Sequence, residues 1–194
     1  MTPLYLLPKI LSFFALSVCL ETVVGFTPLN ITAISSRDGY SVLECWQLAS
    51  VPVEAMSAIN YVISGNTTKA TWSVIRPQTT VGEAWAPTVQ LSMILNGLIR
   101  ITAPSPPPSV NSSGYTAIPG SSSPPPQSVA YIMPGTATSS LLIAADMSST
   151  SYLMGHYTEF PSDEETILVQ VPFAGNEAPE HSVIYEGPCS SSKV

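Results

Sequence analysis

The sequence predicts an all-β protein with a single folded domain, and three observations favour this class. β-branched residues are frequent, whereas no segment shows the sustained period of 3.6 residues that marks a long amphipathic helix. Most apolar runs are short and bounded by Pro, Gly, Ser or Asn, which is typical of strands joined by turns. About 169 residues follow Gly25, a length that suits one domain with its own hydrophobic core.

The expected strands follow one another closely along the chain. Apolar runs between turn residues predict strands at Ser41–Leu48, Ala58–Ser64, Thr71–Ile75, Val89–Leu95, Leu98–Ala103, Val129–Met133, Leu141–Ala145, His156–Phe160 and Ile167–Val171. By contrast, Val51–Ala58 (VPVEAMSA) fits a single helical turn. Many short strands with regular turn signals indicate a β-sandwich or a β-barrel.

The first residues have the pattern of a secretory signal peptide. Lys9 supplies a positive charge, Ile10–Leu20 is a short apolar run, and Val23 to Gly25 offers small residues for cleavage. The apolar run is too short to cross a bilayer, which needs roughly 20 such residues. We therefore expect a signal peptide over residues 1–25, a secreted domain over residues 26–194, and no membrane association after cleavage.

Glycosylation motifs and cysteines agree with secretion. Asn30, Asn66 and Asn111 each begin an Asn-x-Ser/Thr motif and are candidate N-glycosylation sites. Removal of the signal peptide would leave Cys45 and Cys189. In an oxidising compartment two remaining thiols most simply form one disulfide.

The composition excludes one class of partner. Charged residues make up 10 % of the chain, and the formal net charge is −7. Basic residues of the expected mature chain are scattered singly along the sequence, at Arg37, Lys69, Arg76, Arg100 and Lys193. Because no basic patch is available to neutralise phosphates, we expect no nucleic-acid binding.

One segment differs in kind from the rest. Residues 104–128 (PSPPPSVNSSGYTAIPGSSSPPPQS) are rich in Pro, Ser and Gly and nearly free of core residues. This composition predicts an exposed loop with polyproline character. Strands on both sides are needed to complete one sheet system, so we interpret the segment as a loop insertion within a single domain.

Two blocks of sequence, in this order, resemble the cupins, a family of small jelly-roll barrels. In the first block, Ala86-Pro87-Thr88-Val89-Gln90 precedes Gly97 and the apolar run Leu98–Ile101. In the second, Leu142–Asp146 is followed by Gly155-His156. The resemblance covers roughly residues 72–173. It implies an all-β, cupin double-stranded β-helix (jelly-roll barrel) in a single domain.

The resemblance also implies where a metal would bind, and the chain departs from that pattern. Cupins supply two histidines and a carboxylate from the first motif and another histidine from the second. Here Gln90 stands at the carboxylate position, His156 stands at the second-motif histidine, and Glu83 to Ala86 replaces the histidine pair. A metal usually needs at least three protein ligands. We therefore expect no metal and no other cofactor.

His156 and Gln90 are the candidate catalytic residues. An imidazole titrates near neutral pH, so His156 could act as a general base or acid. Gln90 could orient a carbonyl group or stabilise an oxyanion. Asp146 lies at the end of a predicted strand, where we expect it to cap a turn.

The candidate binding residues surround these two positions. Alternation along the strands places Ser92 on the face of Gln90 and Thr158 on the face of His156. Trp85 and Tyr157 are expected to form walls of the pocket. The second histidine of the chain, His181, is expected at the surface or at one end of the barrel.

Three hypotheses of function remain open at the level of sequence. The first is a metal-independent isomerase, cyclase or lyase that acts on a small, fairly apolar molecule. The second is a non-catalytic secreted module that binds a sugar or another small ligand. The third is a metal-dependent oxidoreductase with an irregular ligand set. The expected partner is a small-molecule ligand, and a homodimer is left open.

Overall fold

The computed structural model describes residues 27–56, 58–106 and 125–190, and within these ranges the protein is all-β, as predicted. The predicted signal peptide, Asn111 and most of the Pro/Ser-rich segment lie outside the described residues. The described elements are β1 Asn30–Arg37, β2 Tyr40–Leu48, β3 Val53–Ala55, β4 Ala58–Asn60, β5 Thr71–Ile75, β6 Thr79–Ala84, β7 Gln90–Asn96, β8 Ile99–Pro104, β9 Gln127–Ile132, α1 Ala137–Ser140, β10 Leu141–Ala144, β11 His156–Phe160, β12 Thr166–Pro172, a 3-10 turn at Ala174–Asn176, and β13 His181–Glu186.

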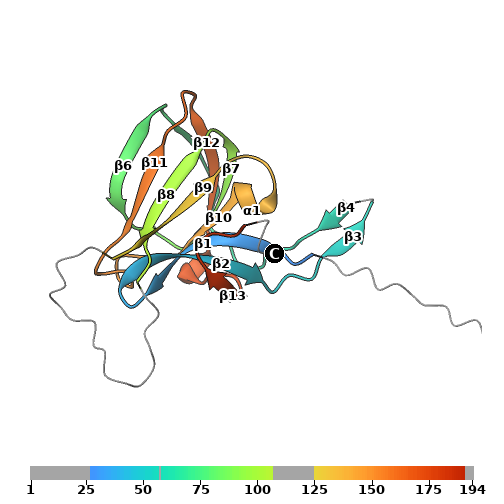
Figure 1. The fold of residues 1–194 in the computed structure, drawn as a ribbon. Coiled ribbons are helices and arrows are strands. Elements are labelled where there is room, and N and C mark those ends of the chain that lie inside the picture. The colour runs from blue at the N-terminus through green and yellow to red at the C-terminus, as the bar shows by residue number, and fades with distance from the viewer. Residues whose placement is uncertain (1–26, 57, 107–124, 191–194) are drawn as a thin grey trace, which may run out of the picture.

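The strands form two main sheets (Figure 1). The larger sheet has the order β13-β2-β1-β10-β7-β12-β5, and the smaller one has the order β6-β11-β8-β9. Neighbouring strands in both sheets are antiparallel except β1 and β10, which pair in parallel. The hairpin of β3 and β4 projects from the body of the molecule (Figure 1).

Alternation of side chains builds the core between the two sheets. On β8, Ile99, Ile101 and Ala103 are buried, whereas Arg100 between them is partly exposed. Strands of the larger sheet contribute to the same core. Its buried members are Ile34, Leu43, Ala86, Ile94, Ile99, Ile101, Ala103, Ala130, Ile132, Leu142, Ala144 and Phe160.

The larger sheet is covered on its other face as well. On β10, Leu142 and Ala144 belong to the core between the sheets, whereas Ile143 belongs to a second buried cluster with Ile31 and Trp46. A strand with apolar contacts on both faces needs a continuous apolar sequence rather than an alternating one. This explains why Leu141–Ala145 was recognisable as a strand.

A glycine turn joins β7 of the larger sheet to β8 of the smaller sheet. Gly97 has φ +80°, a backbone conformation that residues with a side chain rarely adopt. A Cβ at this position would also lie 2.4 Å from Thr166 Oγ1. Asn96 Nδ2 also donates a hydrogen bond to the carbonyl oxygen of Glu165. The turn therefore packs directly against the start of β12, the next strand of the larger sheet.

The predicted strands are largely confirmed, and four further strands were not predicted. β1, β3, β6 and β13 were missed, and β1 matters most because it joins β2 to β10 in the larger sheet. Its sequence, NITAISSR, is too polar for an apolar run to indicate a strand. A sequence signal was nevertheless present in the pair Asp38-Gly39, which is typical of a tight hairpin turn. In the structure both residues have the positive φ that the central positions of such a turn require.

Two local predictions were wrong. Val51–Ala58 does not form a helical turn, because Val53–Ala55 pairs with Ala58–Asn60 as an antiparallel hairpin. The predicted loop at residues 104–128 is too long at both ends, since Pro104 belongs to β8 and pairs with Gln127, and Gln127 and Ser128 belong to β9. The segment therefore joins two neighbouring strands of one sheet, which agrees with an insertion inside a domain.

The predicted disulfide between Cys45 and Cys189 is confirmed. Cys45 lies on β2 and is fully buried, whereas Cys189 follows β13. The backbone N–H of Cys189 also donates to Thr32 Oγ1 at 3.0 Å. The bond therefore holds the segment after β13 against the centre of the larger sheet.

Removal of this disulfide is expected to destabilise the domain. The bond joins cysteines 144 positions apart in the sequence, and chain entropy predicts a loss on the order of 4 kcal/mol in the free energy of unfolding. Urea denaturation of the double variant Cys45→Ala/Cys189→Ala measures this loss, with reduced wild-type protein as the control. Equal denaturation midpoints for the variant and the oxidised protein would contradict the expectation.

Candidate functional site

A cavity of about 180 Å³ lies between the two sheets. Strands β1, β7, β10 and β12 of the larger sheet and strands β8 and β11 of the smaller sheet contribute to its wall. Most of this wall is apolar, with contributions from Ile34, Ala86, Pro87, Ile99, Ile101, Leu142, Ala144, Phe160 and Leu168. Six polar or amphipathic side chains complete it: Trp85, Gln90, Ser92, His156, Thr158 and Gln170.

Five of the predicted site residues line this one cavity. They are His156, Gln90, Ser92, Thr158 and Trp85. Gln90 and Ser92 come from β7, whereas His156 and Thr158 come from β11 in the other sheet. The period of two along each strand therefore placed these pairs correctly on the inner face.

Tyr157 lies outside the cavity, contrary to the pocket wall we predicted for it. It stands between His156 and Thr158 on β11, so its side chain points to the opposite face and is 38 % exposed. The same alternation that places His156 inside therefore removes Tyr157 from the wall.

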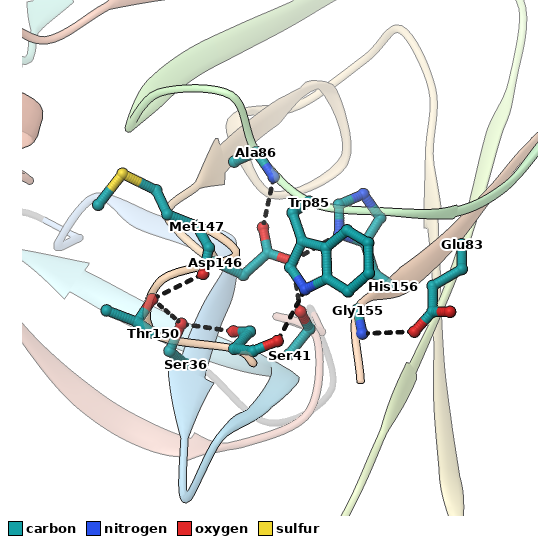
Figure 2. A network of polar contacts seen from close by, with 11 residues as sticks. Ser36, Ser41, Glu83, Trp85, Ala86, Asp146, Met147, Thr150, Gly155 and His156 are labelled. Atoms are coloured by element: carbon teal, nitrogen blue, oxygen red, sulfur yellow. Dashed lines mark hydrogen bonds and ion pairs between the residues drawn. The ribbon is translucent and has the colours of Figure 1, made fainter. Parts of the chain in front are cut away.

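The central polar contact of the site is a buried carboxylate beside His156 (Figure 2). Asp146 is fully buried, with 0 % exposure. Its Oδ2 lies 2.6 Å from His156 Nδ1 and accepts a hydrogen bond of 2.5 Å from Ser41 Oγ. Its Oδ1 accepts a hydrogen bond from the backbone N–H of Ala86 at 3.3 Å. Three donors from separate parts of the chain thus converge on one carboxylate.

This contact fixes the proton arrangement of a neutral His156. The Asp146 carboxylate can only accept, so the proton of the ring lies on Nδ1 and Nε2 keeps its lone pair. Figure 2 shows the second ring nitrogen on the side of the imidazole away from Asp146. Among the residues that the structure describes, no group hydrogen-bonds to Nε2. The arrangement is that of a base oriented by a carboxylate.

Our sequence interpretation of Asp146 missed this role. We expected a turn cap, but the following turn is closed by Met147, whose carbonyl oxygen accepts from the backbone N–H groups of Thr150 and Ser151. The available signal was the pair of Asp146 and Gly155-His156 within one short connection. That signal did not reveal Ser41, which is 105 positions away from Asp146 in the sequence.

Trp85 is held in place at the edge of the cavity. Its Nε1 donates to the carbonyl oxygen of Ser151 at 2.7 Å, and Ser151 Oγ is hydrogen-bonded to Ser36 Oγ (Figure 2). The indole packs directly over Gly155, where a Cβ would lie 2.9 Å from the ring and 2.4 Å from the carbonyl oxygen of Ala84. The glycine before His156 is therefore needed for this close approach.

The residues at the cupin metal positions do not converge on one point. Glu83 pairs with Tyr157 across β6 and β11, and its carboxylate accepts from the backbone N–H of Gly155 at 2.9 Å. It does not line the cavity, which leaves His156 and Gln90 there. In the described part of the chain no three His, Cys, Asp or Glu residues are grouped as metal ligands. This set of donors does not fit a metal ion.

Charge is kept out of the cavity. Within the described residues, its lining includes no Asp, Glu, Lys or Arg. Arg100 on β8 forms an ion pair with Glu159 on β11, and this hydrogen-bonded carboxylate raises the pKa of the guanidinium. Both side chains are partly exposed and lie outside the cavity. His156 is therefore the ionisable group of the lining.

The predicted glycosylation sites differ in accessibility. Asn66 is exposed, in the segment between β4 and β5, whereas Asn30 at the start of β1 is 3 % exposed. A glycan on Asn30 would have no route to solvent in this fold, because a branched sugar cannot be accommodated in a packed core. Of these two sites, Asn66 is the one that the structure leaves available.

Comparison with known proteins gives no assignment. No protein-family model matches the chain, and neither a curated protein nor a solved structure matches it significantly. Among the described residues, no helix is long and apolar enough to span a membrane. The cavity and its side chains are therefore the features of the molecule that bear on function.

Substitution of Asp146 by Asn is expected to change the tautomer of His156. The Oδ1 atom of the new amide can still accept from Ala86, and its NH2 group then faces His156 and donates to Nδ1. The ring proton must consequently move to Nε2. Nitrogen NMR of the imidazole measures the tautomer, and the only other histidine, His181, serves as an internal control. An unchanged Nδ1–H tautomer in Asp146→Asn would show that Asp146 does not orient the ring.

Proposed function

We propose that the protein is a secreted, metal-independent enzyme that isomerises, cyclises or eliminates a group from a small, fairly apolar molecule. The observation that carries this proposal is the bond between His156 Nδ1 and buried Asp146 at 2.6 Å, made by a histidine that lines a mostly apolar cavity. A carboxylate on one ring nitrogen leaves the other as a base and stabilises the imidazolium that forms.

The chemistry needs only proton transfer. His156 Nε2 takes a proton from a carbon or hydroxyl group of the substrate, and the resulting imidazolium is stabilised by the Asp146 carboxylate. Return of the proton to another atom completes an isomerisation or a cyclisation. Loss of a leaving group that then takes the proton completes an elimination. In every case the residues return to their starting state and no external oxidant or reductant is consumed.

The other lining residues support binding and orientation. Gln90 on β7 can donate from its amide to a substrate oxygen that gains negative charge. Ser92 and Thr158 provide hydroxyl groups from the two opposed sheets, and Trp85 forms an apolar wall. Exclusion of water by the apolar wall would strengthen each of these contacts.

We further propose that the fold is a variant of the cupin barrel. The order of the two sequence motifs and the position of Gln90 and His156 in one cavity between two sheets support this relation. The parallel pairing of β1 with β10 is a departure from an antiparallel double-stranded β-helix. The register of this parallel pair, with Thr32 beside Leu142 and Ile34 beside Ala144, would then be a feature that sets this chain apart from an antiparallel double-stranded β-helix.

A general base in an apolar cavity is expected to open benzisoxazole. The base removes the ring C–H proton, the N–O bond breaks, and cyanophenolate forms with a change in absorbance. Replacement of His156 by Asn should lower kcat/KM at least about 100-fold. Circular dichroism checks that His156→Asn is folded.

His181→Asn is the matched control for this experiment. His181 is stacked on Trp46 on another part of the larger sheet, so its loss should leave turnover unchanged. Equal turnover by wild type and His156→Asn would sink the proposal of a histidine base. A wild-type protein that binds the probe without opening it would instead favour the non-catalytic binding module.

Secretion and glycosylation are expected together in a eukaryotic host. The mature protein should begin after Gly25, and Asn66→Gln should lower its mass by one glycan. Asn30→Gln should change the mass only by the CH2 group that Gln adds, with no loss of a glycan, because Asn30 is buried in the folded domain. Intact mass spectrometry with and without glycosidase gives both results. Retention of residues 1–25 in secreted protein, or a glycan found on Asn30, would contradict these expectations.

A further inference from the structure

Gln170 is a cavity residue that the sequence did not indicate. It lies on β12, opposite Ser92 of β7 in the antiparallel ladder, and both side chains line the cavity. Gln90 lies two pairs further along the same ladder, opposite Pro172. The larger sheet thus presents two side-chain amides and one hydroxyl group to the cavity, whereas the smaller sheet presents His156.

A neighbouring strand fixes the amide of Gln170. Ser73 on β5, the edge strand beside β12, donates a hydrogen bond from Oγ to Gln170 Oε1 at 3.1 Å. The oxygen end of the amide therefore has a partner, and the NH2 end keeps two donors. Gln170 is half-buried and lines the cavity, so this NH2 group favours a ligand that accepts a hydrogen bond.

The cavity also limits the size and charge of its ligand. Its volume is about 180 Å³, and a cavity of about 150 Å³ is known to hold benzene. A single substituted ring therefore fits. The described lining supplies no cationic side chain apart from a protonated histidine, so an anion would be desolvated without a permanent partner.

We propose that the substrate is an uncharged carbonyl compound with about one ring, and that Gln170 is the residue that holds its oxygen. This assignment rests on the proposed function, because it gives His156 its substrate. The Gln170 amide donates to the carbonyl oxygen, with Gln90 on the neighbouring strand as a second donor. His156 then takes a proton from the carbon next to the carbonyl group, and the negative charge that moves to oxygen is held by the amides.

Three probe molecules of matched size test this recognition. Acetophenone carries a neutral carbonyl group, cumene replaces the oxygen with a methyl group, and benzoate carries a charge. Binding of each is measured by NMR titration in the same buffer. Wild-type protein should bind acetophenone and show no measurable binding of benzoate.

Substitution of Gln170 by Leu keeps a side chain of similar size but replaces the amide with an apolar group. We expect acetophenone to bind about tenfold more weakly to Gln170→Leu, whereas cumene should bind equally well or more tightly. Ser73→Ala should also weaken the binding of acetophenone, but by less, because it removes the hydrogen bond that holds the amide and leaves the amide in place. Gln127→Leu, at the exposed start of β9, is the control and should change the binding of neither ligand.

The outcomes separate this inference from the proposed function. If His156→Asn still binds acetophenone in a Gln170-dependent manner while wild type fails to open benzisoxazole, carbonyl recognition stands and the proposed catalysis fails. A second result would be that wild type opens benzisoxazole while Gln170→Leu leaves the ratio of the acetophenone and cumene dissociation constants unchanged. That result would overturn the role of Gln170. Preferred binding of benzoate, or no binding of acetophenone, would overturn the substrate class.

Discussion

The buried carboxylate of Asp146 is the interaction on which the rest of the structure depends. Removing a carboxylate from water is costly unless its oxygens accept hydrogen bonds. Here Ser41 of β2, the backbone of Ala86 before β7 and His156 of β11 supply those donors. β2 belongs to the larger sheet and β11 to the smaller one. The bonds that make burial of Asp146 tolerable therefore also tie the two sheets together beside the cavity.

The same bonds have a chemical consequence. Because the carboxylate is held by Ser41 and Ala86, it is preorganised to receive the Nδ1–H of His156 without moving. Gly155 allows the Trp85 indole to approach the backbone directly before His156. One network thus combines a structural role with the proposed catalytic role, and a loss of orientation at His156 would be coupled to a loss of contact between the sheets.

The sequence was most informative where local pattern decides structure. Apolar runs located most strands, and alternation placed Gln90, Ser92, His156 and Thr158 correctly on inner faces. The roles of Asp146 and Gln170 depend instead on Ser41 and Ser73, which are 105 and 97 positions away in sequence. Strand order brings these residues together, and no local pattern encodes it.

A comparison of the two histidines argues that His156 does more than fill space. His181 is partly exposed, its Nδ1 lies 2.7 Å from the carbonyl oxygen of Pro179, and its ring is stacked on Trp46 at 3.5 Å. Packing and a local backbone contact account for that residue. His156 instead uses a fully buried carboxylate as partner and lines a cavity with two amides on the opposite sheet. Burial of a carboxylate has a cost that a packing role would not require, and the proposed orientation of a base would account for it.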